Sequence, residues 1–285
     1  MSSIFPGVIE ISADGSGQYF IIKDGKLAKM SLSDRGALPF ALSGNMSTAA
    51  VKVSDESFIT IKLIDPSDGS VKNTIELPEN FVSVQSGCFL DDKRLAFLHI
   101  DETDDLARRY VVSISTSEKL DDFDSYLIRE ENTKEFINEY LSLGSIVERP
   151  VALQCTEKKL FIISSSVFSD MVQITVYEFN LKSRKLKYIT AYHPVKPESR
   201  FDMYFDPAGA TLYIFNNKRE LISVKENQFP VTRKFNEPGS IFFSPFSQNG
   251  FSISFMPDRP VDGKKEFRTV NISELPEKEI NNNDQ

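Results

Sequence analysis

The side chains that most often carry acid–base chemistry near neutral pH are histidines, and the chain has two, His99 and His193. His99 ends an apolar run and precedes an acidic segment, whereas His193 stands before Pro194 in an expected loop. The Gly-x-Ser-x-Gly elbow of serine hydrolases is absent, and so are both common glycine loops for nucleotide phosphates. We therefore expect no catalytic residue and no bound cofactor.

Adjacent carboxylates are the other residues that could do chemistry, as metal ligands or as an acid–base pair. Three aspartate pairs occur, at positions 91–92, 104–105 and 121–122. Aspartates in such short polar segments are typical of solvated turns. A calcium loop needs oxygen ligands at alternating positions with a glycine and a distal glutamate, and residues 65–69 lack that spacing. We expect no metal site.

The two cysteines, Cys88 and Cys155, each adjoin an apolar run, which is typical of buried free thiols. A single disulfide is the alternative. A zinc site would need more ligands than two cysteines and two histidines readily supply.

The elements that must position these residues are β-strands. Short runs rich in Val, Ile, Phe, Tyr and Thr alternate with Asp, Gly, Asn, Ser and Pro, which is the pattern of strands and tight turns. In residues 18–32, for example, two strands flank Asp24-Gly25, a dipeptide suited to a type I′ hairpin turn. A unit of polar turn and hydrophobic strand recurs at residues 11–22, 53–64, 88–100, 154–164, 203–212 and 241–255.

These copies lie about 40 residues apart, which is the period of four-stranded propeller blades. The sequence therefore predicts an all-β fold, a single β-propeller of six to seven four-stranded blades. We expect the propeller to span residues 1–274 and residues 275–285 to form a disordered tail or linker, because that segment is rich in Pro, Glu and Asn.

Two of the turns carry a family resemblance. Residues 204–212, Tyr-Phe-Asp-Pro-Ala-Gly-Ala-Thr-Leu, and residues 243–246, Phe-Ser-Pro-Phe, resemble the Phe-Ser-Pro-Asp-Gly-x-x-Leu turn of WD40-like propellers. The Trp-Asp dipeptide and the Gly-His pair of that family are absent. The resemblance implies a scaffold that presents peptide-binding surfaces on the faces of its blades.

One segment departs from the strand pattern, and we expect an inserted amphipathic helix there, within an insertion at about residues 121–144. Asn132 and Glu135 fit a helix N-terminus, and Gly144 is placed to end the helix. The apolar stripe of such a helix can pack on the propeller or contact a partner. The partner-binding residues expected from this insertion are Phe123, Tyr126, Phe136, Tyr140 and Leu141.

The charge of the chain limits its partners. The formal net charge is −8, and the basic clusters at residues 182–187 and 264–265 are short, which is typical of solvated strand-end loops. This disfavours direct nucleic-acid binding. No signal peptide and no transmembrane helix are expected, so we place the protein inside the cell, in the nucleus or cytoplasm.

The function expected from these features is a non-catalytic protein–protein interaction scaffold within a multi-subunit intracellular assembly. Its partners would be other protein subunits, with no membrane insertion and no small-molecule substrate. The alternative is a propeller hydrolase or lactonase whose site at the central channel gathers His, Asp, Glu or Arg from several inner strands. A third possibility is a propeller of a ribonucleoprotein assembly, where acidic charge favours protein contacts over RNA contacts.

Overall fold

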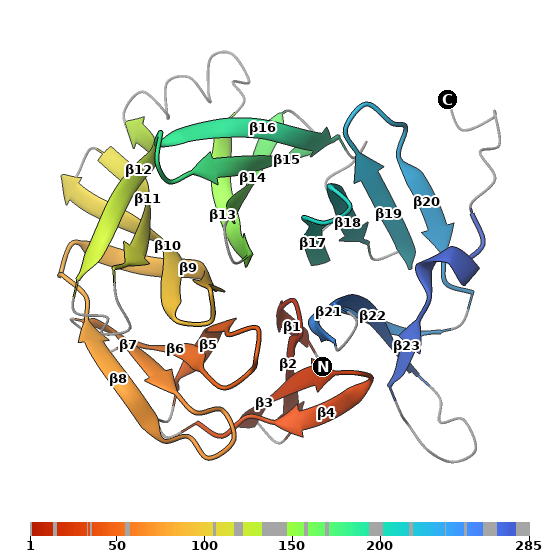
Figure 1. The fold of residues 1–285 in the computed structure, drawn as a ribbon, viewed down its shortest axis with the longest axis horizontal. Coiled ribbons are helices and arrows are strands. Elements are labelled where there is room, and N and C mark those ends of the chain that lie inside the picture. The colour runs from red at the N-terminus through yellow and green to blue at the C-terminus, as the bar shows by residue number, and fades with distance from the viewer. Residues whose placement is uncertain are drawn as a thin grey trace. The chain divides into compact units, whose positions relative to one another are not determined.

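The computed structural model of the 285-residue chain (Figure 1) consists of short antiparallel strands joined by turns. It describes residues 2–13, 16–32, 34, 36–54, 58–104, 107–116, 122–132, 147–156, 159–168, 171–193, 202–216, 219–236, 238–247, 250–258 and 267–277. The chain forms two compact units. One is Met30–Pro197, and the other combines Met1–Lys29 with Glu198–Gln285.

The unit Met30–Pro197 holds three four-stranded sheets, each with its strands in chain order. The strands are β5 (Leu38–Leu42), β6 (Ala49–Ser54), β7 (Ile59–Ile64) and β8 (Val71–Glu76); β9 (Phe81–Leu90), β10 (Arg94–Asp104), β11 (Ala107–Ser115) and β12 (Phe123–Asn132); and β13 (Val147–Thr156), β14 (Lys159–Phe168), β15 (Met171–Asn180) and β16 (Lys185–Tyr192).

The other unit holds two four-stranded sheets and one three-stranded sheet. Its elements are β1 (Ser2–Phe5), β2 (Val8–Ala13), β3 (Ser16–Lys23) and β4 (Lys26–Lys29); β17 (Asp202–Asp206), β18 (Thr211–Phe215), β19 (Glu220–Lys225) and β20 (Val231–Lys234); and β21 (Gly239–Ser247), β22 (Gly250–Pro257), β23 (Arg268–Val270) and the 3-10 helix η1 (Ile272–Glu274).

These six sheets are the blades of a β-propeller, so the predicted all-β propeller fold is confirmed. Each of the six repeat copies found in the sequence falls in a different sheet, which gives six blades and not seven. The expectation of four strands in every blade was wrong for the last blade, since its described residues form three strands.

The turns explain why neighbouring strands pair as hairpins. Between β3 and β4, Asp24 and Gly25 have φ angles of 48° and 72°, as a type I′ turn requires. Between β17 and β18, the Asp206 carboxylate accepts hydrogen bonds from the N–H groups of Ala208 and Gly209 at 3.1 and 3.2 Å. This second turn is one of the two that resemble the WD40-like motif.

In the unit Met30–Pro197, hydrophobic side chains fill the spaces between successive sheets. One cluster joins sheets β5–β8 and β9–β12 through Phe40, Ile61 and Phe97, and a second joins sheets β9–β12 and β13–β16 through Leu98 and Leu160. Sheets with two apolar faces need a neighbour on each side, which is why the strands lack a strict polar–apolar alternation.

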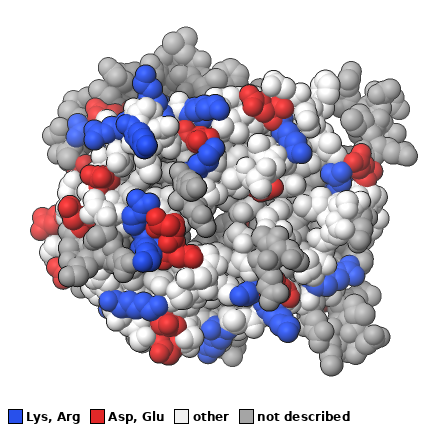
Figure 2. All heavy atoms as spheres, viewed as in Figure 1, with Lys and Arg blue, Asp and Glu red and all other residues white. Residues whose placement is uncertain are grey.

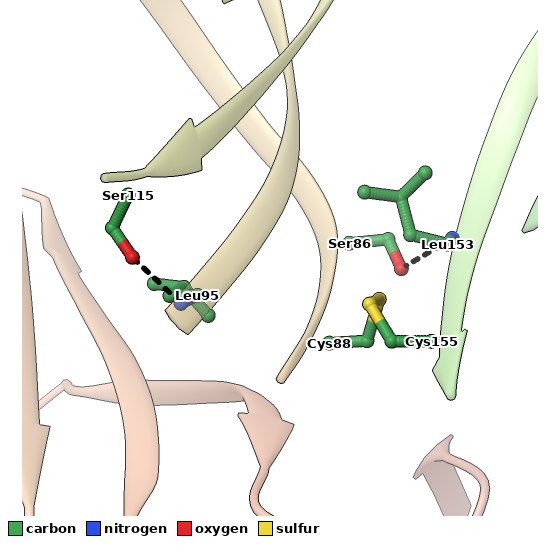
Figure 3. The surroundings of a disulfide bond; sticks show 6 residues. All are labelled: Ser86, Cys88, Leu95, Ser115, Leu153 and Cys155. Carbon is green, nitrogen blue, oxygen red and sulfur yellow. Dashed lines mark hydrogen bonds between the residues drawn. A yellow bond between two sulfur atoms is a disulfide. The ribbon is translucent and has the colours of Figure 1, made fainter. Parts of the chain in front are cut away.

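A disulfide crosses the second of these interfaces (Figure 3). Cys88 on β9 and Cys155 on β13 are bonded, with Cα atoms 5.5 Å apart and a sequence separation of 67. Beside it, the Leu153 N–H donates a hydrogen bond of 3.1 Å to Ser86 Oγ. The expectation of free thiols was therefore wrong. Flanking apolar residues indicate burial of each cysteine, but they do not reveal that the two strands adjoin.

In the other unit, aromatic packing dominates. Sheets β17–β20 and β21–β23 share a cluster that contains Tyr204, Phe243 and Phe255. Gly239 is required at this interface, because a Cβ atom there would lie 2.4 Å from the Phe255 ring. Sheets β1–β4 and β21–β23 are linked by the hydrogen bond from Ser244 Oγ to the Ile22 carbonyl, 2.7 Å long.

The boundaries of the expected insertion and tail are only partly described. Within the insertion at about 121–144, Phe123–Asn132 form the strand β12. The helix expected between the cap Asn132 and Gly144 falls on residues that lie outside the described ones, since 133–146 are not described, and η1 is the one helix among those that are described. Of the expected tail, residues 275–277 are described, and Arg233 pairs with Glu277 there.

Candidate interaction surface

Two of the five predicted partner-binding residues, Phe123 and Tyr126, lie on β12, the last strand of its sheet. The other three, Phe136, Tyr140 and Leu141, lie outside the described residues. The described part of this candidate site therefore rests on two aromatic side chains.

Phe123 and Tyr126 both pack inside the unit, although on different interfaces. Phe123 lies against the cluster between sheets β5–β8 and β9–β12, with its ring centroid 5.7 Å from that of Phe97. Tyr126 lies against the cluster shared with sheet β13–β16, 5.4 Å from Phe179. Both are half-buried, so neither offers a whole ring to a partner. The large apolar side chain that β12 exposes is Leu127, next to Tyr126, at 56%.

A longer exposed segment lies at the edge of the neighbouring sheet. All seven residues 182–188 are exposed, and we call this run the β16 edge. It begins in the turn after β15, where the Asn180 side chain accepts hydrogen bonds from the N–H groups of Lys182 and Ser183 at 3.0 and 2.9 Å. Arg184, in the same turn at φ 56°, lies over the Tyr126 ring at 5.5 Å. This contact connects the β16 edge to β12.

The strand β16 continues from that turn as an edge strand. It pairs with β15 alone, so among the described residues its other side has no neighbouring strand. Successive side chains alternate between the two faces. Lys185 and Lys187 therefore share one face, and Leu186 and Tyr188 share the other.

On the apolar face of the edge, two large side chains are exposed to solvent, Leu186 at 41% and Tyr188 at 51%. The Tyr188 ring lies 6.4 Å from that of its cross-strand neighbour Tyr177. Tyr177 in turn donates a hydrogen bond of 3.2 Å to Glu148, and burial together with this bond raises the pKa of Tyr177 to about 12. The Tyr177 side chain is thus held in place by its hydrogen bond, is uncharged at neutral pH and lies beside the exposed Tyr188.

On the face of the β16 edge that carries the lysines, no described acidic side chain neutralises the positive charge. Within the described part of the chain, Lys182, Lys185 and Lys187 form no ion pair. The carboxylate across from Lys187 is Glu178, and it is bound by Lys159 at 3.1 Å. Figure 2 shows acidic and basic side chains interspersed on the face drawn. The net charge of the chain is −8, so the four cations within residues 182–187, which pair with no described acidic side chain, are a local concentration of positive charge.

The titratable groups with shifted pKa values do not form a second site among the described residues. His99 is fully buried, stacks on Phe81 at 3.9 Å and has its Nε2 2.9 Å from Ser113 Oγ. Burial lowers the pKa of His99 to about 4. A substrate has no access to this ring, which lies in the core.

Among the described carboxyl groups, those whose pKa departs from its ordinary value all have a lowered pKa. Hydrogen bonds from Ser67, Ser70 and Arg94 produce these shifts at Asp65, Asp68 and Asp91. A general acid needs a raised pKa, so these turn residues are not suited to that role. The described residues contain no cluster of three or more His, Cys, Asp or Glu side chains that could hold a metal ion.

No helix in the described part of the chain is long and apolar enough to cross a membrane.

Comparison with known proteins gives distant similarities alone. No protein-family model and no curated protein matches the chain. Similar solved structures include an oligogalacturonate lyase in complex with manganese, at 13% identity and a TM-score of 0.48 over 93% of this chain and 77% of the other. The Nup133 β-propeller domain of Vanderwaltozyma polyspora gives 10% identity and 0.40 over 95% and 83%. The WD40 domain of SCAP from fission yeast gives 11% and 0.38 over 95% and 71%.

The sequence contained a signal for the β16 edge, but its interpretation was incomplete. The basic cluster at residues 182–187 was assigned to a solvated strand-end loop, and its first part is indeed a turn. Its second part is the start of an unpaired edge strand that carries two exposed apolar side chains. Edge position depends on sheet topology, which a local pattern does not contain.

Proposed function

We propose that the chain is a non-catalytic protein–protein interaction scaffold within a multi-subunit assembly inside the cell, in the nucleus or cytoplasm. The observation that carries the proposal is the β16 edge. Among the described residues, it joins a strand edge without a neighbouring strand, lysines without ion pairs, and the exposed Leu186 and Tyr188 in one continuous segment. Exposed apolar residues with a polar rim are typical of surfaces that bind other proteins.

The lowered pKa values of Asp65, Asp68 and Asp91 and the burial of His99 support a role without catalysis. An interaction function also gives Leu186 and Tyr188 a reason to be exposed, since an isolated sheet gains nothing from apolar side chains in water.

The proposal is tested by affinity purification of the tagged chain from its native cells with quantitative mass spectrometry. We expect partners at constant stoichiometry that are lost in the variant Leu186→Ser/Tyr188→Ser. The matched control is Phe229→Ser, which removes a side chain that is 94% exposed in the turn between β19 and β20. Both variants should retain the circular dichroism spectrum and melting temperature of the wild type.

Recovery of the chain alone would contradict the scaffold role. The purified protein would then be assayed for hydrolysis of lactones and esters, as the alternative function requires. Equal loss of partners in the control variant would assign the effect to surface hydrophobicity in general and would contradict the assignment to the β16 edge.

A further inference from the structure

We propose that β16 binds an extended peptide by strand addition, and that this peptide alternates acidic and apolar side chains. This inference rests on the proposed function and names the partner chemistry of the same edge. In strand addition, main-chain hydrogen bonds to a sheet edge give affinity, and alternate side chains give specificity.

The backbone of β16 can receive such a strand. Eight residues, Lys185–Tyr192, form the strand, and their pairing to β15 uses one side of the backbone. A further strand on the other side would extend the sheet β13–β16 by regular hydrogen bonds along Lys185–Tyr188, before the register shift at Ile189. Unpaired strand edges are templates for pairing unless their side chains prevent it.

The two faces of β16 specify which strand fits. A peptide residue that points to the face of Lys185 and Lys187 meets two ammonium groups that no described acidic side chain binds, so a carboxylate is favoured there. The next peptide residue points to the face of Leu186 and Tyr188, where an apolar side chain covers exposed carbon. The alternation of the strand therefore translates directly into an alternation of acidic and apolar residues.

A second copy of this chain is not the occupant that fits. Pairing β16 with another β16 would bring Lys185 and Lys187 of both copies close together, and like charges on adjoining strands are unfavourable. A nucleic acid would use the cations but would leave the strand backbone and the apolar face without partners. The combination of features favours a peptide.

The last strands of the other four-stranded sheets lack this combination. On β8, Lys72 lies 3.5 Å from Asp65. On β12, Asp124 and Glu130 are exposed beside Leu127, so its charge is of the opposite sign. On β20, Arg233 is bound to Glu277 at 2.6 Å. On β4, Lys26 and Lys29 are exposed, but no exposed large apolar side chain accompanies them.

The first test measures fluorescence anisotropy of a labelled peptide of alternating glutamate and valine, eight residues long to match β16. We expect saturable binding to the full chain that weakens about tenfold or more in Lys185→Glu/Lys187→Glu. The matched control Lys26→Glu/Lys29→Glu makes the same change on the edge strand β4 and should bind as the wild type does.

The second test distinguishes strand addition from simple charge attraction. A peptide of the same sequence that is N-methylated at every residue keeps its side chains but loses the N–H donors on both of its edges. We expect it not to bind. Equal binding of the methylated peptide, or tighter binding of a single-stranded oligonucleotide, would overturn the proposal, and so would absence of peptide binding by folded protein.

These outcomes are separable from failure of the scaffold role. If the peptide does not bind but stoichiometric partners are still lost in Leu186→Ser/Tyr188→Ser, strand addition is wrong and the interaction surface remains. If neither peptide nor partner binds, both proposals are wrong.

Discussion

At the residue scale, His99 shows how a side chain that suggests chemistry in a sequence serves a structural role in the fold. It lies on β10 between aromatic rings, with Phe81 at 3.9 Å and Phe97 at 5.5 Å. Its Nε2 is linked to Ser113, whose Oγ is 2.8 Å from that of Ser125. The ring therefore joins the hydrogen-bonded centre of the sheet β9–β12 while remaining neutral.

The lowered pKa of His99 predicts that acid weakens the fold. Its pKa is about 4 in the folded chain and near 6.5 in the unfolded chain, so the unfolded state binds more protons between these values. Stability is complete above pH 6.5 and falls as the pH drops toward 4, by at most about 3 kcal/mol from this group. Urea unfolding at pH 7 and pH 5 measures the change.

The variant His99→Phe is the control for this acid effect, because it retains ring packing and removes titration. Its loss of stability between pH 7 and pH 5 should be smaller than that of the wild type, since carboxyl groups contribute to both proteins alike. An identical pH dependence in the two proteins would show that His99 does not couple protonation to folding.

At the element scale, strands and turns were predictable because their signals are local. Asp24-Gly25 specifies a hairpin wherever it occurs, and the Asp206 turn closes through its own side chain. The features that were not predictable depend on neighbours distant in sequence. Tyr126 is half-buried because sheet β13–β16 packs against β12, and Cys88 meets Cys155 for the same reason.

The disulfide between β9 and β13 predicts a difference in stability between the oxidised and reduced chains. A crosslink across 67 residues stabilises by about 4 kcal/mol if it acts on the entropy of the unfolded chain. We expect dithiothreitol to lower the free energy of unfolding by about 2–4 kcal/mol. Chemical denaturation with and without reductant measures this effect.

The variant Cys88→Ala/Cys155→Ala is the control, because its stability should not respond to reductant. No response in the wild type would show that the thiols are not bonded in solution. Disulfides are uncommon in reducing compartments, so thiol labelling in intact cells also tests the proposed intracellular location directly.

At the scale of the whole molecule, the number of blades was predictable to within one, as six to seven, and the exposed β16 edge was not predictable. Six repeat copies correspond to six sheets, because each copy of turn and strand falls in a different sheet. Recognition of the β16 edge requires knowledge of which strand ends a sheet and which lysines form no ion pair with a described residue. Neither property is encoded in a window of adjacent residues.

The lysines of β16 also have a consequence for self-association. An exposed edge with Leu186 and Tyr188 would pair with its own copy if charge did not oppose it, and edge lysines are a known protection against such pairing. We expect Lys185→Val/Lys187→Val to form dimers or larger species, whereas the wild type and Lys185→Glu/Lys187→Glu remain monomeric. Sedimentation velocity over a range of protein concentrations measures the distribution.

The control Lys26→Val/Lys29→Val makes the same replacement on β4, which has no exposed large apolar side chain to stabilise a pair of edges. Monomeric behaviour of this control together with association of the β16 variant would assign the effect to the combination of open backbone and apolar face. If the β16 variant also remains monomeric, the edge backbone is not available for pairing, and the same result would count against strand addition by a peptide.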